Sequence, residues 1–311
     1  MRVVVLIDRR FADCEHALVS RLTVGLADEG VRVALIWPER VSDAARPDVL
    51  APVIGTDLEM RPPLSWLAPR VLRRRLKEIG YDSFDIVHAF GGSTWRAAAQ
   101  LAASRNAVLA LEVWRSGLAH RVRTLGEINR RRQSSGRPAA GVLALAPDHN
   151  IERELEDGDV GVSVRVAPWG VRTPERPNIV LPPARRRGIV IAGNGRDARL
   201  FSAAFEATLS LVMERDDLMA FVDADAVQRL GLWPRVVANK AESLVTLVAG
   251  LETSRAAPLR SDFVVHPEAR GERRSLLLGA RAAGALVVAA RDDSVEWLKD
   301  GQTAKLVSGA D

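Results

Sequence analysis

The stretch HPEARGERRSLLLGARAAGALVVAARDDSVEWLKDG, residues 266–301, reads as the end of a strand, a loop, a helix interrupted by Gly284, an apolar strand and a polar turn. A short apolar run that follows a helix is typical of a strand buried in a parallel sheet. The loop before the helix then lies at the sheet edge where ligands bind. The stretch therefore predicts a ligand site in an α/β protein.

The rest of the chain repeats this alternation of strand and helix. Amphipathic segments such as 16–30 and 96–106 separate short apolar runs. We expect strands at 3–8, 31–37, 85–90, 107–113 and 141–146, and then at 188–193, 218–224, 235–239, 262–267 and 285–290. This order predicts an α/β protein with two Rossmann-like, doubly wound domains that face each other across a cleft.

The segment TPERPNIVLPPARRR, residues 173–187, separates the two halves. Its prolines and its charge run interrupt every periodicity, which is typical of a linker. A chain of 311 residues also exceeds what one compact core usually serves. We therefore expect an N-terminal Rossmann-like domain over 1–172 and a C-terminal one over 188–311.

Composition excludes several classes of protein. Cys14 is the only cysteine, so an internal disulfide and a multi-cysteine zinc site are excluded. No apolar window approaches the ~20 residues that span a bilayer, and the N-terminus has no signal-peptide core. We expect a soluble, cytoplasmic protein without a cofactor or metal. Only four of its 44 basic residues are lysines, an arginine excess that suits phosphate-bearing partners or reflects codon bias alone.

Several phrases of the sequence resemble the GT-B glycosyltransferases, in particular the retaining family 4, which uses nucleotide-sugar donors. The resemblance covers nearly the whole chain. It rests on the following phrases: LTVGLADEGVRVALI (22–36), DIVHAF (85–90), VAPWGV (166–171), Pro267, GARAAGALVVA (279–289) and VEWLKDGQTAKLV (295–307). The family continues for several helices past its last phrase, so we expect the C-terminal domain to be short at that end.

The resemblance implies where a donor site should lie, and the expected carboxylates are missing there. The family's Glu-x7-Glu pair, which binds the sugar and the ribose, falls on Gly271 and Gly279. We expect Gly279 at the start of a helix. Glu268 and Glu272 lie near the first position and replace its carboxylate if the loop shifts by one residue. Losing two hydrogen bonds to charged groups weakens donor binding by roughly 3–6 kcal/mol.

Other family positions in the N-terminal half are also substituted. The glycine pair that lets phosphates approach the first helix becomes Asp13-Cys14, which adds a negative charge. The histidine expected after the fourth strand is Trp114. His88 is kept in DIVHAF, where a histidine at a strand end is either structural or part of the cleft.

The diphosphate is expected at the turn GNGRD, residues 193–197. The resemblance places the family's arginine and lysine on Asn194 and Arg199, so one cation is kept, and Arg196 lies nearby. Gly193 and Gly195 after a strand and before a helix bring N–H groups close to an anion. The alternative is an ordinary tight turn, since the third glycine of a dinucleotide fingerprint is absent.

Two functions remain open, and the sequence assigns no catalytic residue to either. The first is transfer of a sugar from a nucleotide donor to an unknown acceptor with retention. The second is a catalytically silent binding or scaffolding protein that keeps the fold, with donor binding weak or lost.

Two basic stretches suggest other partners. Residues 63–80 set Leu72 and Leu76 among arginines, which suits either a solvated face or a helix at an anionic inner membrane surface. Residues 119–137 read as a solvated basic loop. Neither stretch interleaves aromatic side chains with its arginines, so nucleic-acid binding is not expected.

Overall fold

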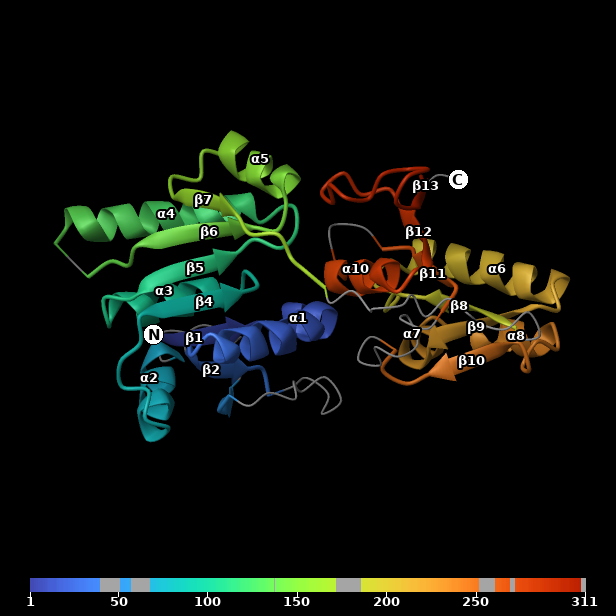
Figure 1. Ribbon diagram of the computed structural model, residues 1–311, viewed down its shortest axis with the longest axis horizontal. Helices are drawn as coiled ribbons and strands as arrows, with labels where there is room; N and C mark the ends of the chain where they lie inside the picture. The colour runs from blue at the N-terminus through green and yellow to red at the C-terminus, as the bar shows by residue number, and fades with distance from the viewer. Residues whose placement is uncertain are drawn as a thin grey trace. The chain divides into compact units, whose positions relative to one another are not determined.

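The computed structural model describes residues 1–39, 51–56, 68–136, 138–171, 186–251, 261–268 and 272–308. The chain forms two compact units, Met1–Trp169 and Gly170–Asp311, each built on its own parallel sheet (Figure 1). The predicted fold class of two Rossmann-like domains is thereby confirmed. The predicted linker over 173–187 lies almost wholly outside the described residues, so its boundaries stay a prediction.

The first unit contains a seven-stranded sheet in the order β3-β2-β1-β4-β5-β6-β7. Its elements are β1 (Arg2–Ile7), α1 (Arg9–Asp28), β2 (Arg32–Trp37), β3 (Val53–Gly55), α2 (Ala68–Glu78), β4 (Ile86–Phe90), α3 (Trp95–Ala103), β5 (Val108–Glu112), α4 (Ala119–Ser134), β6 (Val142–Ala146), α5 (His149–Asp157) and β7 (Ser163–Val166). The central strand β1 is buried on both faces from Val3 to Ile7, which explains its uninterrupted apolar sequence.

The second unit contains a six-stranded sheet in the order β10-β9-β8-β11-β12-β13. Its elements are β8 (Arg187–Ile191), α6 (Ala198–Glu214), β9 (Leu218–Asp223), α7 (Ala224–Arg229), α8 (Trp233–Ala238), β10 (Val245–Val248), β11 (Phe263–His266), α10 (Arg274–Ala282), β12 (Leu286–Ala290) and β13 (Lys305–Val307). Buried residues of α6, α7 and α8 belong to one core cluster, and those of α10 belong to another.

The strand order reverses at one place in each sheet. The first strand of each unit lies in the middle, with β2 and β4 beside β1, and β9 and β11 beside β8. The loops after these central strands therefore leave in opposite directions, and ligands of open α/β sheets bind beyond the carboxyl ends at such a switch point. The residues that follow β1, β4, β8 and β11 are accordingly the first place to look for a site.

Two expectations about local structure are wrong. The run 235–239 is not a strand but the last part of α8, because Pro234 sets the first helical turn; the strand here is β10, at Val245–Val248. The basic stretch 119–137 is not a loop, since Ala119–Ser134 form helix α4. Val122 and Leu125 pack that helix onto the core.

Candidate functional site

The turn between β8 and α6 has the form of an anion site. Gly195 has a φ of +66°, the left-handed region that glycine adopts without strain. Asp197 caps α6 by accepting the N–H of Leu200 at 3.0 Å. The turn aims three backbone N–H groups, those of Asn194, Arg196 and Asp197, at one point. We call these three groups the amide nest.

The amide nest is occupied by the carboxylate of Glu268, which follows β11. Its Oε1 atom accepts the N–H of Arg196 at 2.6 Å and that of Asp197 at 3.2 Å, and its Oε2 atom accepts the N–H of Asn194 at 3.2 Å. Glu268 is buried. A Cβ atom at Gly193 would lie 3.1 Å from the Phe201 ring and 3.4 Å from Oε2, so the glycine chiefly avoids crowding Phe201 beside this contact. A carboxylate of the chain thus holds the donors that a phosphate would need.

Other charges of the second unit are paired around this contact. Arg196 lies 3.5 Å from the Oε2 atom of buried Glu272. The buried guanidinium of Arg273 lies 3.9 Å from Glu268. Burial raises the pKa of Asp223, which caps α7 beside this cluster, and the charge of Arg273 opposes that shift. The cluster is a set of compensated internal charges.

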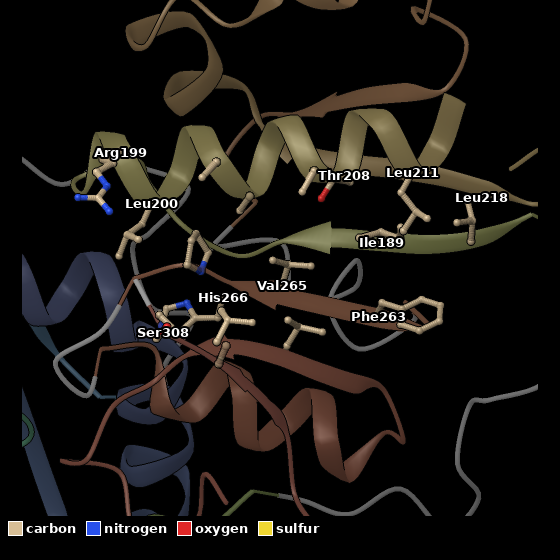
Figure 2. A pocket seen from close by; sticks show the side chains of 18 of the residues that line it. Ile189, Arg199, Leu200, Thr208, Leu211, Leu218, Phe263, Val265, His266 and Ser308 are labelled. Carbon is tan, nitrogen blue, oxygen red and sulfur yellow. The ribbon is translucent and has the colours of Figure 1, made fainter. Parts of the chain in front are cut away.

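Arg199 lies at one end of an apolar groove along α6. Figure 2 shows the groove between α6 and the sheet, with Arg199, His266 and Ser308 near one end and Leu211, Leu218 and Phe263 toward the other. Its volume is about 660 Å³, and no Asp or Glu is among the described residues that line it. Hydroxyl groups of a ribose or sugar bind best to carboxylates, so this groove does not have the chemistry of a sugar-nucleotide site.

The switch point of the first unit is closed in a similar way. Asp8, which follows β1, accepts the N–H of Phe11 at 2.8 Å and the hydroxyl of Ser93 at 3.1 Å. Gly91 follows β4 with a φ of +89°, and a Cβ atom there would overlap the Asp8 carboxylate. Burial raises the pKa of Asp8, and its hydrogen bonds to Phe11 and Ser93 oppose that shift. In both units a carboxylate of the chain therefore bridges the two central strands.

His88 belongs to a buried network at the carboxyl end of the first sheet. Its Nε2 atom lies 3.0 Å from Oε2 of Glu112, and Trp169 donates from Nε1 to Oε1 of Glu112 at 2.6 Å. Glu112 is only 3% exposed. Trp114 is fully buried and packs edge-on against Phe11 at 5.2 Å between ring centroids. His88 and Trp114 therefore hold this part of the core together.

The remaining predicted positions do not join these clusters. Asp13 and Cys14 lie inside α1, just before its non-helical residue Glu15, and not at its first turn. Gly279 is the sixth residue of α10, so the expectation that it starts a helix is wrong. Gly271 lies outside the described residues.

The structure thus brings together some predicted residues and adds others. Glu268 and Glu272 meet the 193–197 turn in one cluster, whereas Arg199 lies at the groove. Asp8, Glu112 and Arg273 were not predicted. Glu112 had a signal, because it is the one charged residue in the apolar run AVLALEV (107–113). Arg273 had none, because GERRS reads as exposed. Among the described residues, no group of three His, Cys, Asp or Glu side chains could hold a metal ion.

Helix α2 carries the arginines of the basic stretch 63–80. Leu72 and Leu76 pack in the core of the first unit, so they are not available to a lipid surface as the sequence suggested. Trp66 and Leu67 lie outside the described residues. Among the helices described, none is both long and apolar enough to cross a bilayer.

Comparison with known proteins identifies the fold. No protein-family model matches the chain, and no curated protein matches it in sequence. Among solved structures, sucrose-phosphate synthase from Thermosynechococcus elongatus is 15% identical, with a TM-score of 0.69 over 100% of this chain and 87% of the other. Anabaena HepE in complex with UDP and glucose is 14% identical, with a TM-score of 0.63 over 99% and 86%.

A third solved structure of this kind is the UDP-GlcNAc 2-epimerase of Methanocaldococcus jannaschii in complex with UDP-GlcNAc and UDP. It is 12% identical, with a TM-score of 0.60 over 99% of this chain and 89% of the other. The two Rossmann-like units and these neighbours show that the chain has the GT-B fold, the class to which many glycosyltransferases belong. At these identities the likeness establishes the fold alone.

Proposed function

We propose that this chain is a glycosyltransferase-like protein that has lost donor chemistry and acts as a binding or scaffolding protein. One observation carries the proposal: the Glu268 carboxylate accepts all three N–H groups of the amide nest. A nucleotide diphosphate needs such donors at the start of a helix. In this chain it would first have to displace a buried carboxylate.

The magnitude of this obstacle supports the proposal. A hydrogen bond to a charged group contributes roughly 1.5–3 kcal/mol, and Glu268 accepts three of them. Arg196, which would face the diphosphate, is paired with Glu272. The glycine at 279 supplies no carboxylate for a hydroxyl group. Each of these features weakens donor binding by itself.

Sugar transfer from a nucleotide donor with retention is the second candidate function. One observation favours it: the amide nest already has the geometry that holds an anion, since it holds Glu268. A diphosphate that displaced this side chain would meet three N–H donors that already point to one place. The exposed side chain of Arg199 lies one turn away on α6. HepE, which shares the fold, was solved with UDP and glucose.

Calorimetric titration with UDP, GDP and ADP separates the two candidates. We expect no saturable binding to the natural chain below about 1 mM, the affinity range of about −4 kcal/mol. Glu268→Ala should bind at least tenfold more tightly, because the amide nest is then open. Glu214→Gln, which removes an exposed carboxylate at the end of α6, is the control. Micromolar binding to the natural chain would overturn the proposal and favour the transferase.

An anionic membrane surface stays a proposed partner of the stretch 63–80. What supports it is the row of exposed arginines on α2, not the leucines, because Leu72 and Leu76 are buried. Attraction between such exposed charges and anionic lipid is screened within about 8 Å at physiological ionic strength. Vesicle flotation should therefore show binding that falls with salt, and recovery independent of anionic lipid would contradict this.

A further inference from the structure

Three helices of the first unit border a small, open cavity lined by arginines. The cavity has a volume of about 240 Å³. Its lining comes from α2, α3 with its C-cap, and α4: Pro69, Arg70, Arg73, Gln100, Ser104 and Arg132. The two basic stretches that the sequence shows as separate therefore meet at one place, although Arg73 and Arg132 are far apart in the chain.

Helical spacing explains why these arginines line the cavity and their neighbours do not. Arg70 and Arg73 are three residues apart and therefore share one face of α2. Arg74 pairs with Glu78 at 3.1 Å, and Arg75 pairs with Glu39 at 3.5 Å. In the part of the chain that the structure describes, neither Arg73 nor Arg132 has a carboxylate within ion-pair distance.

The lining has the chemistry of a phosphate site. None of its described residues is acidic, so three guanidinium groups line one cavity whose described lining offers them no carboxylate. Each guanidinium presents a planar fork of donors that matches two phosphate oxygens. The Gln100 amide adds a neutral donor. The volume of about 240 Å³ accommodates a phosphate group with a small substituent.

We propose that this cavity binds a phosphate monoester through Arg70, Arg73 and Arg132. The same group occurs on small phosphorylated metabolites and on the headgroup of phosphatidic acid, and the site recognises the phosphate in either. The proposal does not depend on the loss of donor chemistry, because the cavity lies in the first unit and the amide nest lies in the second. It shares Arg70 and Arg73 with the stretch 63–80 that is proposed to meet an anionic membrane.

The first test is calorimetric titration of the full chain with inorganic phosphate. Saturable binding at one site is expected. Arg73→Gln with Arg132→Gln should weaken it at least tenfold. The matched control is Arg74→Gln with Arg131→Gln, which removes two charges from the same two helices but none from the lining, and it should change affinity less than twofold. Far-UV circular dichroism checks that every variant is folded.

A second pair of variants tests the fork geometry. Arg73→Lys with Arg132→Lys keeps both charges but loses the planar forks, so phosphate affinity should fall severalfold with little change in net charge. Two results would overturn the proposed site, because both indicate diffuse charge attraction. The first is an equal loss of phosphate affinity in the two glutamine variants, and the second is unchanged affinity in the lysine variant.

The source of the phosphate is tested with vesicles. Flotation with phosphatidic acid, a monoester, is compared with flotation with phosphatidylserine, a diester. Preference for phosphatidic acid that is lost in the Arg73→Gln, Arg132→Gln variant identifies a lipid headgroup. Phosphate binding without that preference identifies a free phosphorylated ligand. Equal flotation on both lipids together with no saturable phosphate binding would overturn the proposal.

Discussion

The Oε1 atom of Glu268 accepts the backbone N–H of Arg196 at 2.6 Å, across 72 positions of sequence. The contact joins the loops that follow β8 and β11, the two strands at the switch point of the second sheet. Asp8 and Ser93 make the corresponding contact between the loops after β1 and β4. In both units the place where open α/β sheets bind ligands is bridged by a side chain of the protein.

Glu268→Gln should expose the amide nest to solvent exchange. Glutamine keeps the shape of the side chain but loses the charge, and each hydrogen bond then weakens by roughly 1–2 kcal/mol. Hydrogen exchange at the amides of Asn194, Arg196 and Asp197 should become about tenfold faster, measured by mass spectrometry on peptides over 193–200. Glu214→Gln is the control. Unchanged exchange in Glu268→Gln would show that the carboxylate does not protect these amides.

Asp8→Asn should gain stability relative to the natural chain as the pH rises. Burial raises the pKa of Asp8 above its usual value of 3.8, so the unfolded state releases this proton first and the free energy of unfolding falls with rising pH. The asparagine side chain of the variant does not ionise and still accepts the N–H of Phe11. Urea unfolding at roughly pH 3 to 7 measures the difference. Exposed Asp82→Asn is the control, and a pH-independent difference for Asp8→Asn would contradict the expectation.

Gly91→Ala should destabilise the first unit more than Gly30→Ala. Both glycines have positive φ angles, +89° and +70°, which cost alanine about 1–2 kcal/mol. Only the alanine at 91 overlaps Asp8, whereas nothing lies within 4 Å of a Cβ atom at 30. Overpacking of this kind adds roughly 1–3 kcal/mol. Denaturant unfolding compares the two variants. An equal loss of unfolding free energy in both would mean that the Asp8 side chain moves aside without destabilising the unit.

Glu112→Ala should destabilise the first unit by at most roughly 1–3 kcal/mol for each partly buried donor left without an acceptor. Those donors are the Trp169 indole and the ring of His88. Glu112→Gln keeps an acceptor and should cost less. Urea unfolding followed by tryptophan fluorescence measures both variants. A loss from Glu112→Gln as large as that from Glu112→Ala would assign the effect to charge and not to the missing acceptor.

Gly279→Glu alone should leave UDP affinity unchanged, because Glu268 still fills the amide nest. Its helix should become more stable by up to about 1 kcal/mol, since Gly279 lies within α10. Together with Glu268→Ala, the new carboxylate should raise UDP-sugar affinity above that of Glu268→Ala with Gly279→Ala. Calorimetry compares these variants. Tight binding by Gly279→Glu alone would show that Glu268 is no obstacle.

Most of the fold could be predicted from the sequence because buried parallel strands leave uninterrupted apolar runs. Nine of the ten expected strands are present within two residues of their expected bounds. The exception, 235–239, is a short run whose β-branched residues suit a strand, yet Pro234 lies in the first turn of a helix there. Local pattern fails at such short segments because a few residues fit either structure.

The candidate site was predicted less well, for a reason of distance along the chain. The turn 193–197 was found from its glycines, and Glu268 was predicted as a carboxylate for the donor, but not as the side chain that fills this turn. The burial of Glu268 depends on N–H groups more than 70 positions away. Arg273 likewise is buried, 3.9 Å from the Glu268 carboxylate. The periodicity of apolar residues predicts helices and strands. It does not indicate which side chain of a loop bridges the ends of two strands.

Because Glu268 is attached to the chain, it competes with any soluble anion for the amide nest. A carboxylate on the same chain acts at an effective concentration in the millimolar range or above, set by the loop and not by the solution. Dilution does not remove this competitor, and a cellular anion of equal intrinsic affinity gains no advantage until its own concentration exceeds that value. A ligand that opens the amide nest must therefore bring additional contacts of its own, beyond the anion that replaces Glu268.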